Sequence, residues 1–176
     1  MTLKFLGNVI EGHPVLYLNV SFDTMKSLAE SQLKDNLPVW FGCDVGKMID
    51  SSTGILDTRV FDYPSVMKTN FDLPKGDRIE FGESRLTHSM LLLGFHRVND
   101  RITRWKVENS WGSKNTQDKP IGKNGFFVMS DSWFSDYTYQ IVVDKKYLSK
   151  EHRSILASKP VELEPWDPLG ALALMH

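Results

Sequence analysis

Two polar residues, His88 and Asn109, have the types and the spacing for acid–base chemistry. His88 opens the apolar stretch 87–98, and Asn109 lies 21 residues later in the stretch 102–110. The dipeptide Asn99-Asp100 between the stretches is a turn signal, so we expect a hairpin that brings both side chains to one end of adjacent strands. A histidine in such a pair can take the proton of a thiol, while the amide oxygen accepts the other ring N–H and fixes the tautomer.

Trp111 follows the amide by two residues and is predicted to cover the His88–Asn109 hydrogen bond from water. Each residue taken alone also has a plainer interpretation: a satisfied histidine, a turn asparagine, a core tryptophan. His96 lies eight residues after His88, but a metal site needs further ligands, and the sequence has no C-x-x-C or H-E-x-x-H pattern. We therefore predict no metal site.

The elements that must position this pair follow from periodicity and from capping and turn residues. A helix is predicted over 21–36, with Ser21 or Asp23 as its cap, because apolar residues recur there at helical spacing. Strands are predicted over 38–43, 87–98, 102–110, 125–129 and 137–144, with a helical turn over 131–135 and a short helix over 149–157. Residues 44–81 lack a period and are too long for an ordinary loop, so they are expected to be functional or partly structured. The fold class predicted is α+β with an antiparallel, β-rich core.

Composition excludes several classes of protein. The 176 residues, 41% hydrophobic and 24% charged, suit one soluble globular domain, with or without a tail. The formal net charge of −1 lacks the excess of positive charge that is typical of nucleic-acid-binding proteins. No apolar run is long enough to span a membrane. A single cysteine, Cys43, and no visible secretory signal fit a reducing, cytoplasmic setting.

Longer motifs give the chain a family resemblance. The sequence NSWG at 109–112, with an upstream His88-Ser89-Met90 strand and a downstream Gly-Phe-Phe strand, resembles papain-like cysteine peptidases. Five further segments narrow the resemblance to the bleomycin hydrolase and aminopeptidase C family. They are PVWFGCDVGK at 38–47, ESRLTHSM at 83–90, WKVENSWG at 105–112, VVDKKYL at 142–148 and PWDPLGALA at 165–173.

The resemblance assigns roles to particular residues. His88 resembles the catalytic base, Asn109 its orienting amide and Trp111 the shielding tryptophan, while Ala173 lies near the usual end of a C-terminal arm that occupies the active-site cleft. It implies residues 1–159 as the His/Asn-bearing, β-rich half of a papain-like fold, with one N-terminal helix, and residues 160–176 as the arm. It also implies a homo-oligomer, a hexameric ring, that cleaves peptides with a free N-terminus and needs no cofactor.

The sequence departs from the family in one large respect. The family's nucleophile lies on an N-terminal Cys-Trp motif, and this chain has no such motif. Cys43 ends a predicted strand beside Asp44, whose carboxylate disfavours a thiolate, so we expect a buried structural cysteine. The chain alone is therefore predicted to be inactive and to require the N-terminal half of the same peptidase. Leu174, Met175 and His176 extend past the usual arm end, which implies either trimming or an altered exopeptidase spacing.

Three functions remain open from the sequence. The first is the C-terminal part of a cysteine aminopeptidase, completed by a separate cysteine-bearing half. The second is a truncated, non-catalytic interaction module, since the face that meets the helical half would be apolar and exposed. The third is a stand-alone hydrolase that uses Cys43.

Overall fold

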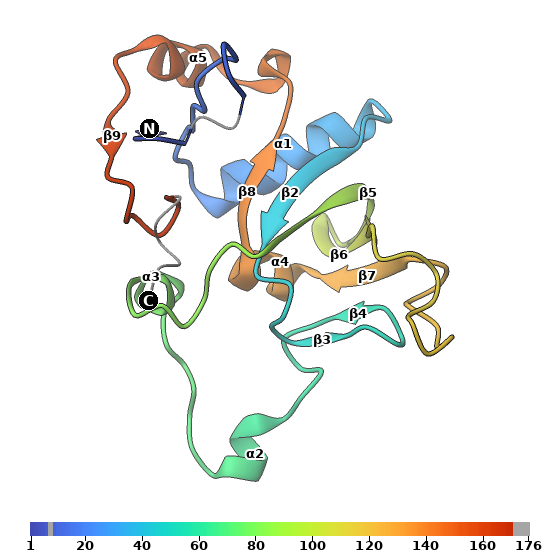
Figure 1. Ribbon diagram of the computed structural model, residues 1–176. Helices are drawn as coiled ribbons and strands as arrows, with labels where there is room; N and C mark the ends of the chain where they lie inside the picture. The colour runs from blue at the N-terminus through green and yellow to red at the C-terminus, as the bar shows by residue number, and fades with distance from the viewer. Residues whose placement is uncertain (7–8, 171–176) are drawn as a thin grey trace.

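The chain is built around a curled sheet, and the two strands that bear the candidate residues lie inside it, away from both sheet edges (Figure 1). The structure is a computed structural model that describes residues 1–6 and 9–170. Within these residues the sheet has seven strands in the order β3-β4-β7-β6-β5-β2-β8. Their bounds are β2 Val39–Cys43, β3 Ile49–Asp50, β4 Ile55–Leu56, β5 His88–Val98, β6 Arg101–Glu108, β7 Phe126–Ser130 and β8 Thr138–Val142. The expected α+β class is confirmed, and neighbouring strands are antiparallel except for the parallel pair β4 and β7.

The hairpin of β5 and β6 forms as the sequence predicts. Asn99 and Asp100 both have positive φ, 46° and 58°, which is the backbone that two-residue hairpin turns require. Leu92 pairs with Val107, and register shifts follow between Leu92 and Gly94 and between His96 and Arg97. The pairing brings the first residue of β5 beside the segment that follows β6.

Capping side chains begin the two longest helices of the described residues. Ser21 accepts a hydrogen bond from the backbone N–H of Thr24 at the start of α1 (Phe22–Lys34), and Ser149 does the same for α5 (Lys150–Ala157) through His152. The predicted helical turn is α4 (Asp131–Tyr137). The remaining helices are α2 (Tyr63–Met67), α3 (Lys75–Glu80) and the 3₁₀ helix η1 (Lys145–Tyr147). The predicted N-terminal helix is α1, while α2 and α3 were not predicted because each is too short to show a helical period.

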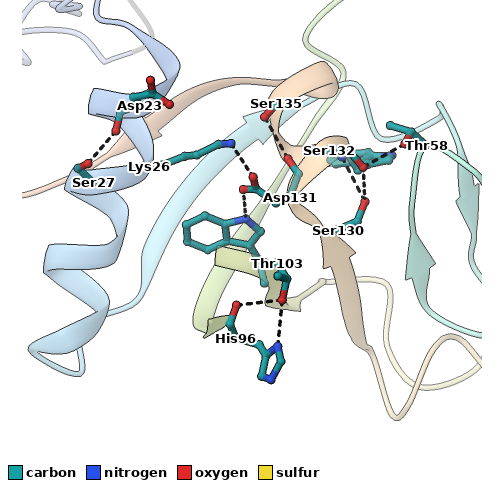
Figure 2. Close-up of polar contacts among 12 residues, drawn as sticks. Asp23, Lys26, Ser27, Thr58, His96, Thr103, Ser130, Asp131, Ser132 and Ser135 are labelled. Carbon is teal, nitrogen blue, oxygen red and sulfur yellow. Dashed lines mark hydrogen bonds and ion pairs between the residues drawn. The ribbon is translucent and has the colours of Figure 1, made fainter. Parts of the chain in front are cut away.

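The core joins the sheet to α1 and α4. Trp105, Trp133 and Phe134 are almost fully buried, and the ring of Trp105 stacks on Phe134 with centroids 4.9 Å apart. Figure 2 shows how Asp131 links these elements, since its carboxylate accepts from the Trp105 indole at 3.2 Å and pairs with Lys26 of α1 at 2.7 Å. Burial of the aromatic rings and this partly buried ion pair hold α1 against the sheet that carries the site.

The two ends of the described chain meet outside the main sheet. β1 (Thr2–Leu3) pairs in parallel with β9 (Glu162–Leu163), and Lys4 forms an ion pair with Glu164. The sequence showed no period after Pro160 and gave no sign of this pairing. Ala173, together with Leu174, Met175 and His176, lies outside the described residues.

Residues 57–82 form a long excursion from the sheet that includes α2 and α3, and α2 lies well away from the sheet in Figure 1. Its exposed large apolar side chains are Phe61, Tyr63, Val66, Met67, Phe71, Leu73 and Phe81. The expectation of partial structure in 44–81 is confirmed, since β3, β4, α2 and α3 lie there. Among the described residues, no helix is both long and apolar enough to cross a membrane.

Candidate active site

His88 and Asn109 meet at one end of the β5–β6 hairpin. His88 is the first residue of β5, and Asn109 directly follows β6. The Nε2 atom of His88 lies 2.9 Å from Oδ1 of Asn109, a hydrogen-bond distance. The side-chain contact expected from the sequence is therefore present, because the hairpin register places the two residues together.

The bond gives each nitrogen of the His88 ring a separate task. With Oδ1 of Asn109 as acceptor, Nε2 carries the proton and donates, and the Nδ1 lone pair is left to accept a proton. Asn109 is buried, and its backbone N–H donates to the carbonyl of Gly125 at 3.1 Å. The backbone of Asn109 is therefore held by Gly125 independently of the side-chain contact with His88. Within the described residues, its buried Nδ2 has no hydrogen-bond partner.

Trp111 lies against the histidine ring. The ring centroids of His88 and Trp111 are 5.2 Å apart with planes at 33°. The ring of Phe127 packs edge-on against Trp111, with centroids 6.2 Å apart. Trp111 is 39% exposed, so it lies at the surface beside the half-buried His88. The shielding role of Trp111 stays a prediction.

Gly125 has a role at the site that the sequence analysis missed. Its φ is +83°, and a Cβ there would lie 3.1 Å from the carbonyl oxygen of Gly112. Gly125 also provides the carbonyl that holds Asn109. Because only glycine fits this backbone without strain, the Gly125-Phe126 step just before β7 is the sequence signal that could have shown it.

Cys43 lies in the core and not in a reactive setting. It is fully buried, although its backbone is directly opposite His88 in the β2–β5 register. Burial first, and the Asp44 carboxylate second, raise the pKa of the Cys43 thiol far above its ordinary range. A thiol held in its neutral form is a poor nucleophile, as the sequence analysis expected. Cys43 is also the single cysteine of the chain.

His96 is far less constrained than His88. It is exposed on the outer part of β5, and its Nδ1 lies 2.9 Å from the Thr103 hydroxyl on β6 (Figure 2). In the part of the chain that the structure describes, no three His, Cys, Asp or Glu side chains lie close enough together to hold a metal ion. The site therefore consists of an oriented imidazole, its amide acceptor and an aromatic cover.

Similarity to known proteins decides the family. The pattern of the Peptidase C1-like family matches residues 1–170. The chain belongs to this family. It is 46% identical over 173 residues to aminopeptidase C from Listeria innocua, covering 98% of this chain and 38% of that protein. It is 38% identical over 176 residues to human bleomycin hydrolase, covering 98% of this chain and 37% of that protein.

A solved relative confirms the fold. The crystal structure of PepW from Lactobacillus rhamnosis superposes with a TM-score of 0.89 at 44% identity, covering 95% of this chain and 37% of PepW. The identities to aminopeptidase C and bleomycin hydrolase confirm that resemblance over 98% of the chain. The chain spans little more than a third of the length of these relatives and corresponds to their C-terminal part.

Proposed function

We propose that this chain forms the His/Asn-bearing part of a papain-like cysteine aminopeptidase and supplies the general base for peptide-bond hydrolysis. The observation that carries the proposal is the 2.9 Å contact between His88 Nε2 and Asn109 Oδ1, with Nδ1 left to face an incoming thiol. His88 and Asn109 are the proposed catalytic pair, and Trp111 is the proposed shield. Residues 1–159 form the peptidase part and 160–176 the arm, with Ala173 near the usual arm end.

The proposed chemistry needs a thiol from a second chain or segment. Nδ1 of His88 takes the thiol proton, and the sulfur attacks the carbonyl carbon of the scissile bond. The C–N bond then breaks, and the leaving amine takes the proton from the imidazolium, which leaves an acyl thioester. Water attacks the thioester carbon and gives a proton to His88, the C–S bond breaks, and the sulfur regains that proton. Asn109 keeps Nε2 protonated and the ring oriented throughout.

The chain alone is proposed to be inactive, since Cys43 is buried and neutral. Its proposed partners are the N-terminal half of the same peptidase, further copies in a hexameric ring, and peptides with a free N-terminus. No cofactor is required by this chemistry. A free buried thiol is stable in the reducing cytoplasm, which is the proposed location.

A second candidate function, a non-catalytic interaction module, is favoured by one observation. Seven large apolar side chains of the 57–82 excursion are exposed, and such a surface marks an interaction site in a soluble protein. In this alternative the excursion binds other subunits, and the His88–Asn109 pair is retained without turnover.

Complementation distinguishes the two functions. The purified chain is mixed with the cysteine-bearing N-terminal half of the Listeria innocua aminopeptidase C, and release of a fluorophore from an aminoacyl amide is followed. The proposal predicts activity that a thiol alkylator abolishes and that His88→Ala removes. The matched variant His96→Ala, on the same strand but exposed, should keep it. Stable binding without turnover supports the interaction module instead.

A further inference from the structure

Asp44 is a buried carboxylate outside the His88–Asn109 pair. It is only 5% exposed, and no cationic side chain among the described residues pairs with it. Its Oδ2 accepts from the Ser84 hydroxyl at 2.8 Å and from the Arg85 backbone N–H at 3.3 Å. A buried charge is costly unless it is hydrogen-bonded, so these donors compensate its burial.

Ser84 connects Asp44 to β8 through a second hydrogen bond. Its side chain is buried and donates to Asp44, and the hydroxyl of Tyr139 on β8 donates in turn to Ser84. Burial raises the pKa of Tyr139, which keeps its hydroxyl protonated and able to donate at neutral pH. The carboxylate at the end of β2 is therefore linked to the segment before β5 and to β8.

The backbone on both sides of Asp44 holds the residue that precedes His88. The N–H of Thr87 donates to the carbonyl of Cys43 at 3.0 Å, and the N–H of Val45 donates to the Thr87 hydroxyl at 3.2 Å. The next residue along, His88, is directly opposite Cys43 in the β2–β5 register. Residues 82–87 belong to no helix or strand, so these bonds fix the point at which β5 begins.

We propose that Asp44 is a positioning residue for His88. Its carboxylate holds residues 84–87 through Ser84 and Arg85 and so sets the ring orientation that the bond to Asn109 requires. The inference rests on the proposed function only for calling His88 the base. The alternative is that the Asp44 cluster stabilises the fold without any particular effect on the histidine.

The test is made on the full chain by NMR of the His88 ring. Two quantities are followed: the solvent-exchange rate of the Nε2 proton, and the nuclear Overhauser effect between the rings of His88 and Trp111. In Asp44→Asn the exchange rate should rise about tenfold, since the oxygen that accepts from Ser84 and Arg85 loses its charge, and hydrogen bonds to a charged group are stronger than neutral ones by about that factor. The contact with Trp111 should weaken at the same time.

Two control variants separate positioning from stability. Asp50→Asn removes a carboxylate that accepts in the same way from Ser52 and Thr53, but in an exposed turn. Leu28→Ala removes apolar contact from the buried face of α1 and lowers global stability while every polar group of the cluster stays in place. Both should leave His88 exchange within about twofold of the parent chain, because neither touches residues 84–87.

Tyr139→Phe keeps the proposal testable if Asp44→Asn does not fold. It removes one hydroxyl from the outer end of the cluster, and His88 exchange should again rise, by at least about threefold. A folded Asp44→Asn or Tyr139→Phe whose His88 exchange and Trp111 contact match the parent chain would overturn the proposal, as would an equal effect in Leu28→Ala. These readouts need no catalysis, so a failed complementation assay would overturn the proposed function and leave this inference standing.

Discussion

Replacing Asn109 by alanine should separate the stability of the fold from the chemistry of the site. The variant loses one neutral hydrogen bond, the 2.9 Å contact with His88, worth about 0.5–1.5 kcal/mol. It also removes the buried Nδ2, which has no partner among the described residues and whose desolvation costs about 1–3 kcal/mol. The two effects oppose each other, so we expect the free energy of unfolding to fall by no more than about 1 kcal/mol.

The effect on turnover should be much larger. During the proposed reaction His88 becomes positively charged, and a hydrogen bond from a charged donor is worth about 1.5–3 kcal/mol. In the complex completed by the cysteine-bearing half, kcat/KM should therefore fall by about tenfold to a hundredfold. Asn115→Ala is a matched control, because that side chain also accepts hydrogen bonds but in an exposed loop.

Urea unfolding followed by tryptophan fluorescence measures the first quantity, and fluorophore release from an aminoacyl amide measures the second. A stability loss above about 3 kcal/mol would mean that Asn109 supports the core and does not chiefly orient the ring. Unchanged turnover would refute the assignment of Asn109 as the orienting amide.

Three other changes have equally definite outcomes. Trp111→Leu should speed solvent exchange of the His88 Nε2 proton, because the ring that lies 5.2 Å away is lost; unchanged exchange would argue against shielding. Gly125→Ala should cost about 1–3 kcal/mol of unfolding free energy, because φ is +83° and the new Cβ meets the Gly112 carbonyl, whereas Gly46→Ala, in open space, should cost little. Lys75 is partly buried and faces the charge of Arg78, which together lower its pKa from 10.5 to about 7 in the folded chain. The unfolded chain then binds more protons between pH 7 and 10.5, so stability relative to Lys75→Met should rise over that window, by at most about 1.4 kcal/mol per pH unit. Below pH 7 both states are protonated, and the cost of burying the charge is fully present. An equal difference in unfolding free energy between the parent chain and Lys75→Met at pH 7 and at pH 9.5, measured by denaturation, would contradict this.

The hairpin and the site pair could be predicted because the determinants are local. Asn99 and Asp100 both adopt positive φ, as their residue types favour, and the turn fixes which residues of the two strands meet. Once the hairpin is placed, the spacing of His88 and Asn109 brings their side chains together. The cap of α1 at Ser21 likewise depends on only a few adjacent residues.

The elements that were missed depend on contacts between distant parts of the chain. β3 and β4 have two residues each, too few to show a period, and β1 finds β9 only after about 160 intervening residues. The Asp44 cluster was missed for the same reason. Its hydroxyl donor, Ser84, lies 40 residues away in a segment without regular structure, and no spacing rule connects a carboxylate to such a donor.

The central claim is that His88 activates a thiol supplied from outside this chain, and alkylation of that thiol tests it most directly. The cysteine-bearing half is combined with this chain or with its His88→Ala variant, and iodoacetamide labelling of the nucleophile is measured by mass spectrometry from pH 5 to 9. An imidazole that holds the thiol as thiolate predicts fast labelling that is nearly constant down to about pH 6. The variant should label slowly at low pH and accelerate towards pH 8.5, as a free thiol does. Identical pH profiles for the two complexes would contradict the account.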